Sequence, residues 1–338
     1  MNDFTMKQLL IVTGSCSLLI LAALFMLTKG SAAIEVHTII SVVSEQLLGF
    51  SSHDFSAIEE VIVWNVRWQR IALALLVGSG LAISGACFQT IFKNPLADPF
   101  LLGVSSGAAL GAAVSIILQC TQFLIPFAFS GAILSLALVY LVSRQKTIAG
   151  AGHHLLLAGI ACSALLNALL SASMALNANQ IHLIVFWLMG SMTNYMDSLL
   201  PLFFLVSAGL AVAMVFARDL DVLALGDEEA RFLGVDVNRV KFLLLVSSTL
   251  VTGACVSVSG IIGFIGLIVP HMVRRIIGPE HFMLLPLSAI WGALFLLAAD
   301  SLTRIFPPLS SIPVGVITAL FGSPFFLYIL YVTGRRRQ

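Results

Sequence analysis

The sequence has very little charge. Its 338 residues include 17 Lys and Arg and 16 Asp and Glu, so 10% of the chain is charged, whereas 59% is hydrophobic and the mean hydropathy is +1.05. Soluble domains carry about 25% charged residues. The composition therefore excludes a soluble globular protein and predicts an all-α, polytopic membrane protein. A net charge of +1 also argues against nucleic-acid binding.

Paired cysteines and catalytic motifs are missing as well. The cysteines lie singly in apolar stretches, without CxxC spacing, so a packing role is favoured over a disulfide framework or a zinc site. No GxxxxGK[ST] loop, GxSxG elbow or HExxH helix occurs. We therefore expect a non-catalytic chain that binds no ATP through a P-loop and holds no metal or cofactor. The cysteines are Cys16, Cys87, Cys120, Cys162 and Cys255.

Acidic residues are nearly absent from the expected membrane interior. Only Asp300 comes near it, close to the outer end of an apolar run. Proton- or sodium-coupled carriers usually place a carboxylate deep in a span. The sequence therefore favours an energy source outside this chain, with an ion-coupled secondary transporter as the alternative class.

Long apolar runs fill most of the chain, and a membrane-spanning helix needs about 20 apolar residues. We expect ten spans with both chain ends inside, because this arrangement places thirteen of the 17 Lys and Arg on the inner side. The run 266–279 is short but completes this count, whereas 180–192 is too short to cross and is expected to be interfacial or re-entrant. The expected spans are 8–28, 68–92, 100–118, 122–142, 154–175, 197–217, 241–265, 266–279, 283–304 and 313–333.

Two parts of the sequence align with each other. The copies begin on the second and seventh expected spans, so they face opposite ways across the membrane, as inverted repeats do. We expect spans two to five, about 66–175, and spans seven to ten, about 241–334, to form this repeat within a single domain over 1–338. The matched positions are Gly78 with Gly253, Ser84-Gly85 with Ser259-Gly260, Pro95 with Pro270, and Gly103 with Gly278.

Ten charged residues crowd into the segment 218–241, between apolar runs. A charge at the bilayer centre costs about 2.5–3.5 kcal/mol, so this segment must lie outside the hydrocarbon, and the topology places it in the cytoplasm. Within it, 226–234 reads as a short helix between two glycines, with Asp227 and Arg231 spaced to pair. Phe232 and Leu233 supply an apolar patch. The helix is either a solvated loop helix or a docking helix with an apolar anchor and a polar rim.

A proline-rich turn follows the second expected span. Pro95 and Pro99 end one helix and begin the next, and Asn94 and Asp98 can cap the freed backbone groups. The segment is either a plain cytoplasmic turn or a constriction at the inner mouth of a pathway, with Asn94 and Leu96 at the constriction.

Three arginines break the positive-inside trend. Arg67 and Arg70 share a helical face at the outer start of the second span, and Arg304 ends a later span on the same side. They are either membrane anchors, with local pairing to Glu59 and Glu60, or a surface that binds acidic residues of an external partner.

The longest motifs resemble those of the permease subunits of type II ABC importers for cobalamin, haem and ferric siderophores. The resemblance runs from about residue 60 to 333, with nothing comparable at 29–60. The motifs that carry it are RWQRIALALLVGSGLAISGACFQTIFKNPLADPFLLGVSSGAALG, LALGDEEARFLGVD, SGIIGFIGLIVPHMVRRIIGPEH, LLAADSLTR and IPVGVITALFGSPFFLYIL.

This resemblance implies a ten-span permease in the bacterial cytoplasmic (inner) membrane, working as a homodimer or with a paralogous permease. Its implied partners are two cytoplasmic ABC ATPase subunits, which hydrolyse the ATP, and a periplasmic or lipid-anchored substrate-binding protein. The implied cargo is a metal chelate, with a ferric siderophore or other iron complex as first candidate and haem or cobalamin as alternative.

The resemblance also implies roles for the residues above. Arg67, Arg70 and Arg304 would dock carboxylates of the binding protein, and Asn94 and Leu96 would form the cytoplasmic gate. The run 180–192, with Trp187 and Gly190, would correspond to the outer gate. The ATPase-coupling helix would comprise Gly226, Asp227, Glu228, Glu229, Ala230, Arg231, Phe232, Leu233 and Gly234.

Overall fold

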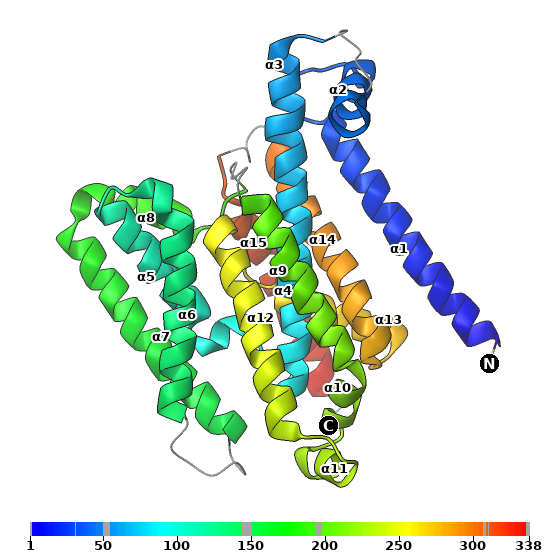
Figure 1. The fold of residues 1–338 in the computed structure, drawn as a ribbon, viewed down its shortest axis with the longest axis vertical. Coiled ribbons are helices and arrows are strands. Elements are labelled where there is room, and N and C mark those ends of the chain that lie inside the picture. Colours follow the sequence, from blue (N-terminus) through cyan, green and yellow to red (C-terminus); the bar gives the residue numbers. More distant parts are fainter. Residues whose placement is uncertain are drawn as a thin grey trace.

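The fold is known from a computed structural model, which describes residues 2–30, 32–49, 55–143, 151–192, 198–306, 309 and 311–335. Within these ranges the chain forms helices and no strand (Figure 1). The longer helices are α1 (Asn2–Thr28), α2 (Val36–Leu48), α4 (Gln69–Ile91), α5 (Val104–Ile117), α6 (Leu124–Ser143), α7 (Ala151–Leu176), α9 (Leu199–Val215), α12 (Val237–Ser259), α13 (Ile265–Ile277), α14 (His281–Ile305) and α15 (Val314–Arg335). The shorter ones are α3 (Ala57–Glu60), α8 (Ile181–Leu188), α10 (Ala217–Leu223) and α11 (Asp227–Phe232).

Each expected span coincides with a helix, but the count of ten is not confirmed. Six helices are long and apolar enough to cross a membrane, and α9 with α10 forms a seventh candidate that is bent by 59°. The helices α5 and α15 are apolar but shorter, and α13 has 13 residues, which is about 20 Å of helix against a hydrocarbon core of about 30 Å. As expected, α8 is too short to cross, with 8 residues.

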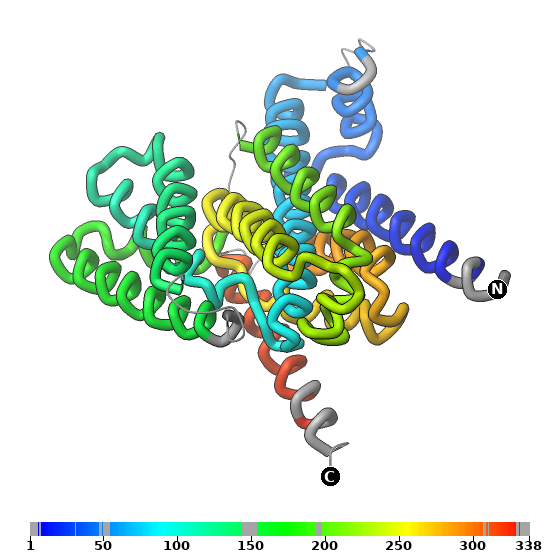
Figure 2. Tube along the Cα trace, turned by 60° about the horizontal axis from the view of Figure 1, so that its bottom comes forward, coloured from blue at the N-terminus to red at the C-terminus, as the bar shows by residue number. Residues whose placement is uncertain are grey.

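The helix α4 runs through the middle of the molecule and packs against α9, α12, α13 and α14 (Figure 1). It continues directly from α3 and a π-helical segment, Val61–Trp68, at the end of the molecule where α2 lies. The short helices α10 and α11 lie at the opposite end. Figure 2 shows α5 to α8 gathered on one side of α4 and α12, where they have their own hydrophobic cluster.

The packing confirms an inverted repeat. Lys93, just after α4, and Lys241, the fifth residue of α12, both bind Asp227, so the two helices run in opposite directions. The helix α4 packs on α14 as α12 packs on α6, and α5 packs on α6 as α13 packs on α14.

Two of the aligned residue pairs are not equivalent. Pro270 lies inside α13, whereas Pro95 lies in the turn after α4. Likewise Gly103 directly precedes α5, the third expected span, but Gly278 precedes α14, the ninth. The connection between α12 and α13 is shorter than that between α4 and α5, so a constant offset loses register after the first helix of each copy.

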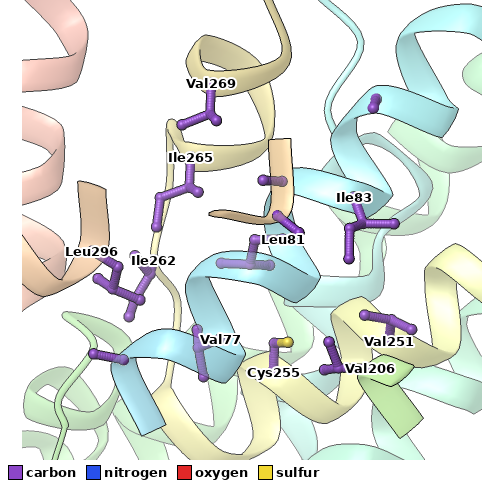
Figure 3. Packing of buried hydrophobic residues seen from close by; sticks show 14 of the residues in the cluster. Val77, Leu81, Ile83, Val206, Val251, Cys255, Ile262, Ile265, Val269 and Leu296 are labelled. Atoms are coloured by element: carbon purple, nitrogen blue, oxygen red, sulfur yellow. The ribbon is translucent and has the colours of Figure 1, made fainter. Parts of the chain in front are cut away.

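Small side chains let the central helices approach closely. A Cβ at Gly78 would overlap the carbonyl oxygen of Gly292 in α14, and one at Gly253 in α12 would lie 3.1 Å from the Ala132 side chain in α6. Figure 3 shows the core between these helices, where Val77 and Leu81 of α4 lie among Cys255 of α12 and Ile265 of α13. Close backbone approach of this kind is typical of membrane helices, which gain no hydrophobic free energy from one another.

We predict that Gly78→Ala lowers the free energy of unfolding by about 1–3 kcal/mol, because the methyl group would push α4 away from α14. The matched control is Gly14→Ala in α1, where a Cβ meets nothing within 4 Å and alanine favours the helix by about 1 kcal/mol. Thermal unfolding in detergent measures both. Equal midpoints for the two variants would contradict the close contact.

Candidate functional site

The helix α11 carries the apolar patch predicted within the charged segment 218–241. Asp227, Glu228 and Glu229 occupy its first turn, where carboxylates complement the helix dipole. Gly234, in the left-handed region with a φ of 85°, ends the segment, so the helix between two glycines is confirmed. Phe232 is 91% exposed and Leu233 is 64% exposed, whereas Ala230 is fully buried against the protein. The helix lies at one end of the molecule (Figure 1). It therefore exposes an aromatic side chain beside charged residues at that end.

Asp227 does not pair with Arg231 as the spacing suggested. Its carboxylate lies 2.8 Å from the Nζ of Lys93 and accepts a hydrogen bond of 2.5 Å from the Nζ of Lys241. Burial raises the pKa of Asp227, but the bonds from Lys241 and Lys93 outweigh it and hold the pKa below its usual value. The helix α11 is thus tied to the end of α4 and to the start of α12.

The turn after α4 has the capping contacts predicted for it. The Asn94 side chain accepts a hydrogen bond of 2.9 Å from the Leu96 backbone N–H, and the Asp98 side chain accepts one of 2.9 Å from Phe100. Lys93 has a φ of 49°, in the left-handed region, which turns the chain out of α4. Asn94 directly follows Lys93, and Asn94 and Leu96 are both exposed in the turn whose residue Lys93 binds Asp227 of α11.

Polar residues in the last turns of α4 were not singled out in the sequence. The Gln89 amide donates to the carbonyl oxygens of Gly266 (3.1 Å) and Leu267 (3.0 Å), at the start of α13, and accepts from Arg274. Thr90 Oγ1 and His281 Nε2 share a hydrogen bond of 2.7 Å. Gln89 and Thr90 are both buried, and their adjacency near the end of an otherwise apolar helix was the signal available in the sequence.

The three arginines that were expected on the outer side come together at the other end of α4. Arg67 is 2% exposed and donates to the carbonyl oxygens of Leu27 (2.7 Å) and Ala32 (2.5 Å). Arg304 donates to those of Met26 (3.3 Å) and Lys29 (2.7 Å). Both guanidinium groups therefore bind carbonyl groups at the C-terminal end of α1, which is the end that favours positive charge.

Arg70 instead forms an ion pair with Asp300. Its Nε and Nη2 lie 2.8 Å and 2.7 Å from Asp300 Oδ1, and Nη2 also donates to Thr303. The Asp300 side chain is fully buried, whereas that of Arg70 is 29% exposed. Pairing of the arginines with Glu59 or Glu60 is not found in the described ranges. Glu59 binds Ser56 in a capping box, and Glu60 accepts a hydrogen bond from Gln46.

The short helix α8 is held between two other helices at its end. The Ser191 N–H donates to the carbonyl oxygen of Ser259 at 2.7 Å. A Cβ at Gly260, after α12, would overlap the Trp187 carbonyl oxygen, and one at Gly315, in α15, would overlap that of Met189. The structure thus joins the run 180–192 to the end of α12 and the start of α15 through contacts that only glycine allows.

We predict that Asp300→Ala lowers the free energy of unfolding by about 2 kcal/mol, less than the roughly 3–5 kcal/mol of a fully buried pair because Arg70 is partly exposed. The double variant Arg70→Met with Asp300→Leu should recover part of this loss, since no charge is then left unpaired. Thermal unfolding in detergent distinguishes the two. A double variant as unstable as Asp300→Ala would contradict the ion-pair account.

Comparison with known proteins connects these features. Residues 18–332 match the model of the FecCD transport family, so the match includes 29–60, which the motifs had left outside the resemblance. The chain is 44% identical to the cobalamin import system permease protein BtuC of Halobacterium salinarum, over 80% of this chain and 73% of that protein. It is 41% identical to the hemin transport system permease protein HmuU of Yersinia pestis, over 79% and 83%.

Two further matches cover nearly the whole chain. The chain is 36% identical to the Fe(3+)-citrate import system permease protein YfmE of Bacillus subtilis, over 94% of each protein. A solved structure described as an inward-facing conformation of a metal-chelate type ABC transporter superposes with a TM-score of 0.80 at 32% identity, covering 95% of this chain and 98% of that one. By the family match and these relatives, the chain belongs to the FecCD transport family.

Proposed function

We propose that this chain is the membrane-spanning permease subunit of an ATP-driven importer that carries a metal chelate into the cytoplasm. The observation that carries the proposal is the helix α11. It exposes Phe232 beside charged residues, and its Asp227 forms an ion pair with Lys93, which directly follows the end of the central helix α4. The membership of the FecCD transport family supports it. An iron complex is the first candidate cargo, since relatives are named for hemin and for ferric citrate. Cobalamin is the second candidate, because a relative at 44% identity is named for it.

The ATPase partner would bind α11. The sequence contains no P-loop, so hydrolysis of ATP would belong to separate cytoplasmic subunits, and we propose two of them per transporter. Phe232 and Leu233 supply an apolar anchor, and Asp227, Glu228 and Arg231 supply a polar rim, which is the composition of a protein–protein contact. Residues 226–234 would then pass the movement of the ATPases to the spans, with Asn94 and Leu96 as the cytoplasmic gate.

The outer arginine cluster, Arg67, Arg70 and Arg304, would dock a periplasmic or lipid-anchored binding protein. Arg70 is partly exposed and Arg304 half-buried, so these two would meet the partner's carboxylates. Arg67 is buried and would support the surface from beneath by holding the end of α1. Asp300 is occupied by Arg70, which speaks against its use as a coupling-ion site in a secondary transporter.

The transporter would reside in the bacterial cytoplasmic membrane, with both chain ends inside, and would contain a second permease, either an identical copy or a paralogue. Native mass spectrometry of the complex purified through this chain tests the whole proposal. We expect two ATPase subunits, two permeases and a binding protein that carries a chelate of matching mass. The amount of binding protein captured by the permease should fall as ionic strength rises, because exposed charges are screened. A permease purified without any ATPase subunit would contradict the proposal.

For α11 we predict that Phe232→Ala weakens ATPase binding by about 2 kcal/mol or more, roughly 30-fold in Kd, as for a buried aromatic anchor. The substitution removes no internal packing, because the side chain is 91% exposed in the chain. The control is Ile58→Ala, which removes a side chain that is 72% exposed at the outer end. Co-purification of the ATPase subunits measures the effect, and retention equal to that of the control would refute the role of Phe232.

A further inference from the structure

Two acidic residues of the segment 217–232 reach the same end of α4. The first is Asp227 in α11, whose carboxylate lies between Lys93 and Lys241. Lys93 is the residue directly before Asn94, so this contact ends at the turn that contains the proposed gate. The carboxylate is about one-third exposed, yet it binds groups from two other parts of the chain instead of a neighbour in its own helix.

The second acidic residue, Asp221 in α10, reaches α4 through a histidine. Asp221 Oδ1 accepts hydrogen bonds from the backbone N–H of His281 (2.8 Å) and from its Nδ1 (2.6 Å). The other ring nitrogen of His281 shares the 2.7 Å hydrogen bond with Thr90 in α4. His281 is 1% exposed and stands at the first position of α14, so this chain of bonds passes through the interior.

The two contacts act on one short stretch at the end of α4. Thr90 and Lys93 are three residues apart, and the Lys93 N–H donates to the Thr90 carbonyl oxygen at 3.1 Å, so they belong to a single turn. Earlier in α4, Gly78 lies against α14 and Gly85 lies against α13, so closely that an added side chain at either position would overlap the backbone of the neighbouring helix. A displacement of α10 and α11 therefore has a bonded route to this last turn, while the rest of α4 is fixed by packing.

We infer that Asp221 and Asp227 are positioning residues that bind the end of α4 at two points, Thr90 through His281 and Lys93 directly after the helix, and transmit movement of the segment 217–232 to Asn94 and Leu96. The inference rests on the proposed function, because it takes α11 as the ATPase contact and the turn 94–96 as the gate. It adds the connection between them within one chain. On this account the gate moves with α11 directly, without a rearrangement of the central packing.

The test uses the full chain with its co-purified ATPase subunits in lipid nanodiscs. A cysteine introduced by Leu96→Cys reports on the gate through its rate of labelling by a maleimide, corrected for labelling of the parent chain. The rate is compared between nucleotide-free and vanadate-trapped complexes, and ATP hydrolysis and ATPase retention are measured on the same samples. No cargo is needed for any of these readouts.

In the otherwise unchanged complex, trapping should change the labelling rate. Asp227→Asn and Asp221→Asn should each reduce that change by about fivefold or more, the smaller end of typical coupling between sites. Lys93→Met should reproduce the effect of Asp227→Asn, and Thr90→Val that of Asp221→Asn, without adding to it when combined, because each pair shares one contact. Hydrolysis and ATPase retention should persist in Asp221→Asn, Thr90→Val and Lys93→Met, because none of these residues belongs to the proposed ATPase contact on α11. The control is Glu280→Gln, which removes an exposed neighbouring charge whose side chain makes no cap hydrogen bond.

The outcomes separate the inference from the proposed function. If the labelling rate changes on trapping as much in Asp227→Asn and Asp221→Asn as in the unchanged complex, the positioning role of the two aspartates is overturned. The importer proposal is then left intact. If Glu280→Gln reduces the change in labelling rate as much as the two aspartate variants do, the inference is also overturned, since removal of any nearby charge would then have the same effect. Lys93→Met leaves α11 and its bond to Lys241 in place, so it decides the Asp227 contact even if Asp227→Asn assembles poorly. Absence of ATPase subunits from the unchanged complex refutes the proposed function itself.

Discussion

Close approach of α4 to its neighbours is the constraint on which this structure depends. In lipid the helices gain nothing from hiding apolar surface from one another, so they hold together through contact area. Gly78, Gly85 and Gly292 provide that contact by bringing backbone onto backbone, and the larger side chains of Figure 3 fill the space beside them. A helix packed in this way behaves as a rigid element, and its movable parts are confined to its ends.

The charged contacts and most of the polar contacts of α4 accordingly lie at its two ends, while Ser79 and Ser84 in its middle each donate one hydrogen bond to a backbone carbonyl oxygen. At the end near α2, Arg67 and Arg304 bind the carbonyl groups that terminate α1, and Arg70 neutralises Asp300. At the end near α11, Gln89, Thr90 and Lys93 connect α4 to α13, α14 and α11. One end would meet a binding protein and the other an ATPase, so a rigid central helix with a polar junction at each end suits a transporter whose energy source is a separate protein.

The sequence predicted more of the fold than of the site contacts. Apolar run length located the helices, and the glycines around 226–234 located α11, because both signals are local. The number of spans could not be read in the same way, since α5 is shortened by the turn at Gly103 and α13 has 13 residues, so neither reaches full length on its own. The constant offset used to align the two repeats matched Pro95 wrongly with Pro270, because the connections in the two copies differ in length.

Contacts between residues that are far apart in the sequence could not be predicted from local sequence patterns. Asp227 was expected to pair with Arg231 one turn away, but two lysines from other helix ends lie closer to its carboxylate. Arg67 looked like an exposed charge at a helix start, whereas the end of α1 covers it and supplies its acceptors. Asp221, His281 and Thr90 are far apart in the sequence and meet only through the packing of α10, α14 and α4.

The most direct test of the account is to measure which energy source drives transport. Proteoliposomes that contain the permease and its co-purified ATPase subunits, with the binding protein outside and ATP inside, should accumulate a ferric chelate or one of its haem or cobalamin counterparts. The account predicts that uptake requires ATP, is blocked by vanadate and is unaffected when proton and sodium gradients are collapsed. Uptake that continues without ATP and follows either ion gradient would contradict it.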